Sequence, residues 1–122
     1  MPYEIIDEGI GLVFRFGGNV ATKDLMAANA EGWEHPNWQS HRYQIWDYAD
    51  VETITMEEPD PLLIAKMDSV AFRTTLPMKI AFIANTKQIV DFCESYIASL
   101  VIENMEARTF SDEVAARQWL DG

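Results

Sequence analysis

Residues 42–61 read RYQIWDYADVETITMEEPDP, and this stretch decides the fold. Its first part, Tyr43–Tyr48, is mainly apolar, which is typical of a strand buried on both faces in a parallel sheet. The acidic residues that follow predict a loop, and Asp60-Pro61 predicts a helix start, with a capping residue before proline. A strand that leads through a loop into a helix is the unit of an α/β domain, where ligands gather at the carboxyl ends of strands.

Toward the N-terminus the pattern changes to two shorter strands and a helix. We expect strands at Tyr3–Ile6 and Leu12–Phe16, since apolar side chains alternate in the second of them with a period of two. The glycines of residues 8–11 predict a hairpin, and residues 17–19, Gly-Gly-Asn, predict the end of the second strand. A helix with Thr22 as its N-cap then continues to about residue 33.

Toward the C-terminus, strands and helices alternate. The expected elements are a helix from Asp60 to about Thr75, a strand at Met78–Ala84, a helix from Thr86 to Leu100, a strand at Glu106–Phe110 and a last helix capped by Ser111. The order ββαβαβαβα predicts a single α/β domain over residues 1–122, with a mixed, mostly parallel five-stranded sheet and helices packed on it.

The composition excludes several classes of function. A net charge of −11 disfavours contact with nucleic acid or with anionic lipid surfaces, and no apolar stretch reaches the ~18 residues of a membrane span. The single cysteine, Cys93, cannot form an internal disulfide, and its apolar surroundings predict a buried side chain. We therefore expect a cytoplasmic domain that is not inserted in a membrane.

Four stretches resemble the STAS-like domains, in particular the SpoIIAA-like group. They are FRFGGNVATKDL (14–25), HPNWQSHRYQIWDYADVETI (35–54), MKIAFIAN (78–85) and ARTFSDEVAARQWL (107–120). The resemblance implies a bacterial, non-enzymatic regulatory domain that binds a protein partner. For the SpoIIAA-like group it also implies a likeness to CRAL-TRIO lipid-binding domains.

The resemblance does not carry over the phosphorylation switch of anti-sigma-factor antagonists. In those proteins a serine at the start of the second helix is phosphorylated. Aligned on Asp47 and Val51, this chain has Met56 at the serine position, Thr55 at the preceding Asp, and Glu58 at the glycine. We therefore expect a domain that is not switched by phosphorylation at this site.

The residues themselves offer no catalytic constellation. The acids around residues 47–60 match no calcium loop, and His35 and His41 lack further zinc ligands. No serine lies in a nucleophile elbow. The sequence thus predicts no enzyme, no metal and no cofactor, and the acids of the loop are interpreted mainly as helix-capping or solvated groups.

Apolar side chains near the third strand leave two functions open. Met56 in an acidic frame suits a contact surface for a protein partner or a second copy of the chain. Aromatic rings gather here too, and large rings can line a pocket for an apolar small molecule, anchor an interface or fill the core; Trp46 is assigned to the core. The candidate partner- or ligand-binding residues are Tyr48, Asp50, Thr55, Met56, Glu57, Glu58 and Leu62.

Overall fold

The computed structural model describes residues 3–34, 42–55, 78–99 and 105–121. Within them, no helix is both long and apolar enough to cross a membrane. The expected helix from Asp60 to Thr75 lies outside the described residues.

The described elements follow the expected order. They are β1 (Tyr3–Asp7), β2 (Gly11–Ala21), α1 (Thr22–Glu34), β3 (Tyr43–Thr55), β4 (Met78–Ile83), α3 (Lys87–Ser99), β5 (Met105–Phe110) and α4 (Glu113–Asp121).

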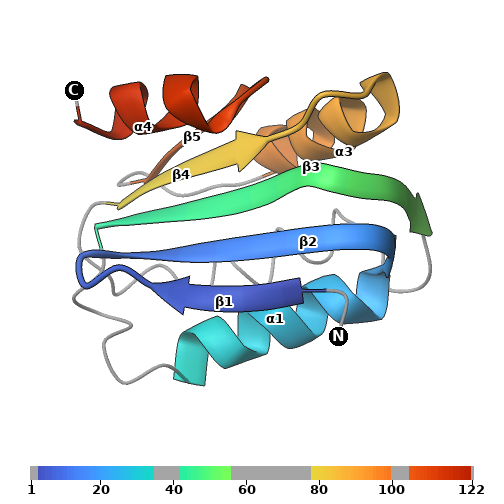
Figure 1. The fold of residues 1–122 in the computed structure, drawn as a ribbon, viewed down its shortest axis with the longest axis horizontal. Helices are drawn as coiled ribbons and strands as arrows, with labels where there is room; N and C mark the ends of the chain where they lie inside the picture. Colours follow the sequence, from blue (N-terminus) through green and yellow to red (C-terminus); the bar gives the residue numbers. More distant parts are fainter. Residues whose placement is uncertain (1–2, 35–41, 56–77, 100–104, 122) are drawn as a thin grey trace.

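The strands form one five-stranded sheet in the order β1-β2-β3-β4-β5 (Figure 1). β1 pairs with β2 in antiparallel fashion, and the other three pairings are parallel. The hairpin between β1 and β2 forms as predicted: the amide of Glu8 donates to the carbonyl of Gly11, and Gly9 has a φ of 88°, where glycine is favoured. The predicted mixed, mostly parallel α/β sheet is therefore confirmed.

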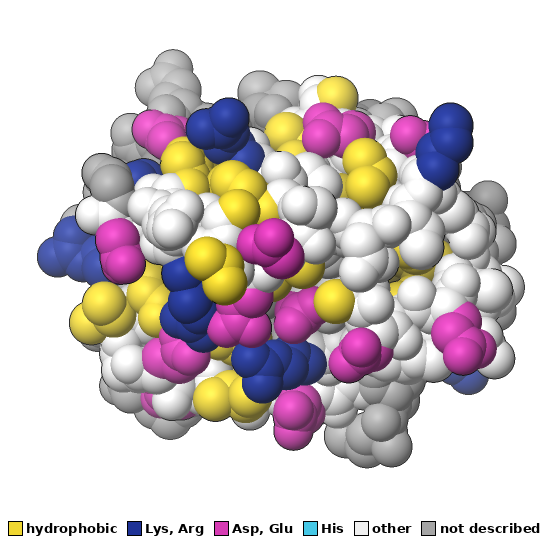
Figure 2. All heavy atoms as spheres, turned by 45° about the horizontal axis from the view of Figure 1, so that its top comes forward, with side chains coloured by type: hydrophobic (Ala, Val, Ile, Leu, Met, Phe, Trp, Pro, Cys, Tyr) yellow, Lys and Arg dark blue, Asp and Glu magenta, His cyan; other side chains and the backbone are white. Residues whose placement is uncertain are grey.

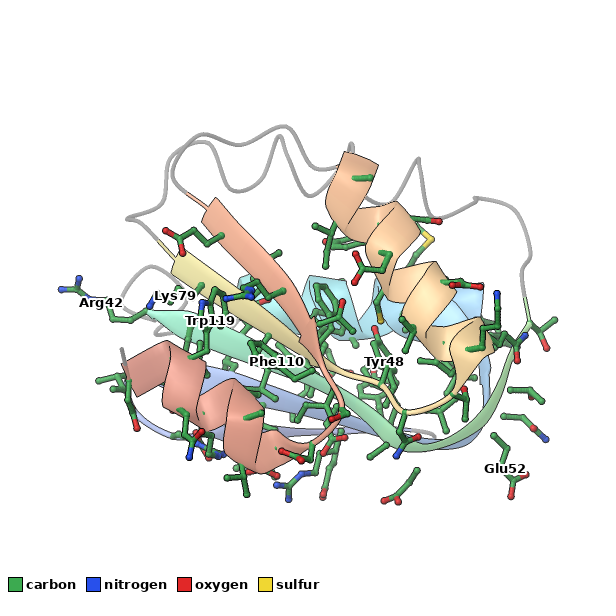
Figure 3. All side chains as sticks on the ribbon, turned by 90° about the horizontal axis from the view of Figure 1, so that it is seen from above. Arg42, Tyr48, Glu52, Lys79, Phe110 and Trp119 are labelled. Carbon is green, nitrogen blue, oxygen red and sulfur yellow. The ribbon has the colours of Figure 1, made fainter. Side chains whose placement is uncertain are left out.

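One face of the sheet carries the main core. Its side chains lie between the sheet and helices α1 and α3, which both lie on this side, whereas α4 lies on the other (Figure 3). Ala28 of α1 and Cys93 of α3 are fully buried, so the prediction of a buried cysteine is confirmed. Burial raises the pKa of the Cys93 thiol to about 12, which keeps it protonated and unreactive.

Stacked aromatic rings fill the middle of this core. Phe14 of β2 lies parallel to Trp46 of β3 with 4.1 Å between ring centroids, and Phe16 stacks on Trp46 and on Tyr48. The Trp46 indole donates to the buried amide oxygen of Gln44 at 2.9 Å, which satisfies both polar groups. Trp46 is thus a core residue, as expected.

The opposite face has a smaller apolar cluster under α4. Val13, Ile45, Ala81 and Ile83 of the sheet are buried against α4, whose Ala116 is fully buried, and Trp119 and Leu120 are half-buried. The Lys79 ammonium lies over the Trp119 ring, 5.2 Å from its centroid, and donates to the Trp119 carbonyl. The last helix thus packs on the sheet through Ala116, Trp119 and Leu120.

Two sequence-based predictions of element ends were wrong. Residues 17–19 do not end the second strand, because β2 continues to Ala21 through irregular pairing with β3. The third strand does not stop at Tyr48 but continues to Thr55, so residues 50–55 form strand rather than loop.

Two helix caps also differ from the prediction. At α4 the carboxylate of Asp112 accepts from the amide of Ala115 at 2.8 Å, so Asp112 rather than Ser111 is the N-cap. α1 begins at Thr22, and the carboxylate of Asp24 accepts from the amide of Ala21 at 2.9 Å. Asp24 is the third residue of the helix and Ala21 is the residue before it, so this hydrogen bond is the one that a capping box forms from the third helical position back to the cap residue.

A chain of ion pairs joins α4 to the sheet and to the β1–β2 turn. Figure 2 shows acidic and basic side chains interleaved on this side of the molecule. Arg15 contacts Asp47 at 3.6 Å and Glu113 at 3.1 Å, and Arg117 contacts Glu113 at 2.6 Å and Glu8 at 2.8 Å. We call these five residues the α4 ion network.

Arg117 determines how two carboxylates of the network titrate. Its hydrogen bonds hold the pKa values of Glu8 and Glu113 below their ordinary value of 4.5. Because the folded state favours the charged carboxylates, the network stabilises the fold above about pH 4.5 and loses this contribution as the pH falls through the lowered pKa values.

Replacing Phe14 with alanine tests the aromatic core. We expect the free energy of unfolding to fall by about 3–5 kcal/mol, since the ring is fully buried and the stack cannot close over the cavity. Urea denaturation followed by circular dichroism measures the loss. Val114→Ala is the control, because Val114 is 67% exposed and should change stability by less than about 0.5 kcal/mol. Equal losses in the two variants would contradict the assignment of the core.

Replacing Arg117 with methionine tests the α4 ion network. We expect a loss of about 1 kcal/mol at pH 7, a modest value because the charged groups are partly exposed. The difference from the wild type should shrink below about pH 4.5, where Glu8 and Glu113 become protonated. Denaturation midpoints between pH 3 and 7 measure this. Lys87→Met is the control, because the pair of Lys87 with Asp91 is 90% and 63% exposed and should show little of this effect.

Candidate functional site

β2 and β3 extend past the rest of the sheet at the carboxyl end of the parallel strands. β3 pairs with β4 only from Tyr43 to Asp47, whereas its pairing with β2 continues to Thr55. We call the second half, in which Gly17–Ala21 pairs with Asp50–Thr55, the β2–β3 ribbon. On its outer side, β3 has no strand partner among the described residues beyond Asp47. Within the described residues, this edge has no strand to pair with, and an unpaired strand edge is a template for pairing with another chain.

Two bulges in β3 shape the ribbon. The register jumps from Arg15–Asp47 to Gly17–Asp50, and then from Gly18–Val51 to Asn19–Thr53, so β3 has one extra residue at each step. Glu52 is the extra residue at the second step and has no register partner. Bulges bend a strand and re-aim its side chains. Here they turn Val51 and Ile54 into the core and leave the residues between them exposed.

Glycine and a side-chain bond stabilise this geometry. Gly18 has a φ of 69°, a left-handed conformation that side-chain-bearing residues adopt at a cost. Across the ribbon the hydroxyl of Thr53 donates to the amide oxygen of Asn19 at 2.6 Å. The ribbon is thus anchored by its buried side, and a side-chain hydrogen bond joins its two strands on the exposed side.

The carboxylates near the ribbon divide into two kinds. Asp47 is engaged, because it accepts from the amide of Ala49 at 2.9 Å and pairs with Arg15. Asp50 and Glu52 are exposed, and neither forms an ion pair or a side-chain hydrogen bond within the described ranges. Figure 3 shows Glu52 at the far end of the ribbon, away from the helices. These two carboxylates are therefore available to a partner.

The predicted site residues occupy different places. Tyr48 is buried beneath the ribbon, between the Phe16 ring and the edge of Phe92. Asp50 and Thr55 are exposed on the ribbon, as a contact surface requires. Met56, Glu57, Glu58 and Leu62 lie outside the described residues. Glu52, one of the acids of residues 47–60 that the sequence analysis interpreted as capping or solvated groups, is exposed on the ribbon as well.

The described part of the ribbon carries carboxylates, hydroxyls and an amide, and neither a cysteine nor a histidine. In the described part of the chain, no three histidine, cysteine or acidic side chains gather to hold a metal ion. Cys93, with its raised pKa, lies in the core. The ribbon has two exposed carboxylates and a strand edge that no described strand pairs with, and such groups suit hydrogen bonding and charge pairing.

Comparison with known proteins identifies the fold. No family model matches the sequence, and no curated protein matches it either. The chain is similar to the solved structure of the anti-sigma factor antagonist SpoIIAA in its unphosphorylated form, with a TM-score of 0.59 and 11% sequence identity. The match covers 98% of each chain. At this identity the likeness concerns the fold alone, and this chain therefore has the STAS-like fold of SpoIIAA.

Proposed function

We propose that this chain is a non-enzymatic regulatory domain that binds a protein partner, or a second copy of the chain, through the β2–β3 ribbon. Asp50, Glu52 and Thr55 would make the contact, joined by Met56, Glu57, Glu58 and Leu62, which follow in the chain. Tyr48 would support the ribbon from the core. The shared fold with an anti-sigma factor antagonist supports a regulatory role.

The observation that carries the proposal is that, among the described residues, β3 has no strand partner on its outer side beyond Asp47, and that the exposed carboxylates of Asp50 and Glu52 form no ion pair there. An extended segment can add to such an edge through backbone hydrogen bonds, while side chains give specificity. The chain as a whole carries a charge of −11, so it attracts a basic partner over some distance. The partner that fits is a protein with lysine or arginine side chains next to an extended segment.

Two further parts of the proposal concern what the domain does not do. Met56 stands where the antagonists have a phosphorylated serine, so we infer that kinase control at this position is absent. We also infer that the domain is not an enzyme, since its fold is that of an anti-sigma factor antagonist and, in the described residues, the ribbon holds no cysteine, histidine or metal-binding cluster.

The alternative from the sequence, a carrier of an apolar small molecule, stays a prediction. The described rings that could have lined a pocket pack on one another instead. Tyr48 stacks on Phe82 with 6.4 Å between centroids, and Phe82 contacts Tyr96 at 5.5 Å. These contacts favour recognition at the surface over recognition in the core.

The double variant Asp50→Lys, Glu52→Lys tests the contact surface. We expect it to lose the partner, because two attractive charges become repulsive at the proposed contact. Affinity purification from the native cell extract with quantitative mass spectrometry identifies the partner, and titration calorimetry with that purified protein measures the loss. We expect the affinity to fall by at least about tenfold and binding of the wild type to weaken with added salt.

The matched control is Asp91→Lys, Glu94→Lys on α3, where both side chains are exposed and the change in charge is the same. This variant should retain the partner. Equal losses in both variants would show a general charge effect and contradict the ribbon. An apolar ligand that co-purifies with the wild type, seen by native mass spectrometry, would favour the carrier instead.

A further inference from the structure

The second edge of the sheet is β5, at the opposite side of the fold from β1. β5 pairs with β4 on one side only, and no strand of the described residues lies on its other side. Figure 3 looks onto this edge, with α4 on one side of it and α3 on the other. The strand is short, and it reads Met105-Glu-Ala-Arg-Thr-Phe110. Edges of this kind pair with other strands unless something blocks them.

One hydrogen bond shows which backbone amides and carbonyls of β5 face β4 and which face outward. The amide of Ala84 donates to the carbonyl of Phe110 at 2.9 Å, so the polar backbone groups of Phe110 point toward β4. These groups alternate in direction along a strand. The amides and carbonyls of Met105, Ala107 and Thr109 therefore point outward, and those of Glu106 and Arg108 point inward.

The side chains of Glu106 and Arg108 lie on the α4 face of the sheet. Their register partners are Lys79 and Ala81, and Ala81 is buried under α4. Both Glu106 and Arg108 are exposed, whereas Ala107 and Thr109 on the other face are half-buried. The Arg108 guanidinium lies 5.9 Å from the centroids of Phe110 and Trp119, which holds it beside the edge.

We propose that two copies of the chain pair through β5 in antiparallel fashion, about a two-fold axis at Ala107. In this register the outward backbone groups of Met105, Ala107 and Thr109 meet, and they can form roughly six hydrogen bonds between the copies. Glu106 of each copy then lies opposite Arg108 of the other. Because the backbone groups of Glu106 and Arg108 point inward, this is a non-hydrogen-bonded pair, the kind in which the facing side chains lie closest together. Two opposite-charge contacts therefore stabilise the pairing.

The charges select this register over its neighbours. A two-fold axis at Arg108 satisfies the same backbone pattern but places two arginines opposite each other, and an axis at Glu106 does the same with two glutamates. β1, the other edge strand, reads YEIID, and its charged residues are all acidic. It therefore cannot pair with a second copy of itself through opposite charges. Self-complementary charge is thus a property of β5 and not of β1.

The dimer goes beyond the proposed function and does not depend on it. The two edges lie at different places in the sheet, since β5 is the outer strand and the ribbon belongs to β2 and β3. The variant Asp50→Lys, Glu52→Lys should therefore still form the dimer. Loss of the ribbon contact, whether its partner is another protein or a second copy, and loss of the β5 dimer can be told apart, because they follow from different variants.

Sedimentation of the full chain tests the proposal through a charge swap. We expect the wild type to change from monomer to dimer between roughly 1 and 200 µM, since a short edge makes a small interface. Arg108→Glu and Glu106→Arg should each weaken the dimer at least about tenfold, because like charges then face each other. The double variant Glu106→Arg, Arg108→Glu should restore it, because the opposite charges have only exchanged places.

Two further variants test the dimer without reversing a charge, so they apply even where a charge reversal impairs folding. Ala107→Pro removes an outward amide that β4 does not use, so the fold should be retained and the dimer lost. Ala107→Cys should form a disulfide between copies under mild oxidation, since paired strands place these Cα atoms ~5.5 Å apart. Val114→Cys, also exposed but on α4, should not. A wild type that is monomeric throughout, or a dimer that Ala107→Pro leaves intact, would overturn the proposal.

Discussion

β2 and β3 lie side by side over ten register pairs, from Gly11 with Tyr43 to Ala21 with Thr55, and the other elements are arranged around this pairing. The pairing stacks Phe14 on Trp46, and these rings belong to the core between the sheet and helices α1 and α3. On the other face it brings Arg15 next to Asp47, from which the ion pairs reach α4. Its overhang beyond β4 is the β2–β3 ribbon. Both layers of the fold and the candidate site thus depend on one strand pair.

The parts of the fold that follow local patterns could be predicted from the sequence. Alternation in Leu12–Phe16 and three- and four-residue spacing in α3 are strong signals, since each comes from the regular period of a single element. The end of β3 could not be read in this way. Tyr48, Val51 and Ile54 are buried at every third residue, because the bulges add residues to the strand. A period of three resembles neither a regular strand nor a regular helix, so the segment was interpreted as a loop.

The ion network and the two sheet edges escaped the sequence analysis for a different reason. Arg15 and Glu113 are 98 residues apart in the chain, and Glu8 and Arg117 are 109 apart, so no local pattern links them. Their partnership follows only from the strand order and from the place of α4. In the candidate site, Asp50 was singled out from the sequence because of its position after a strand. That Asp47 is engaged and Glu52 is not depends on the bulges, which only the structure shows.

The two faces of the sheet are covered unequally, and this has a consequence for how the protein opens. α1 and α3 cover a large aromatic core, whereas α4 is a nine-residue helix with one fully buried side chain. Elements with few buried contacts open at lower free energy than the rest of a fold. α4 should therefore be the first unit to detach, and a pH below about 4.5 should favour this, because Glu8 and Glu113 then lose their charge. Detachment of α4 exposes the apolar side chains of Val13, Ile45, Ala81 and Ile83. Slow aggregation of the protein at low pH would therefore begin at this face while the sheet is still intact.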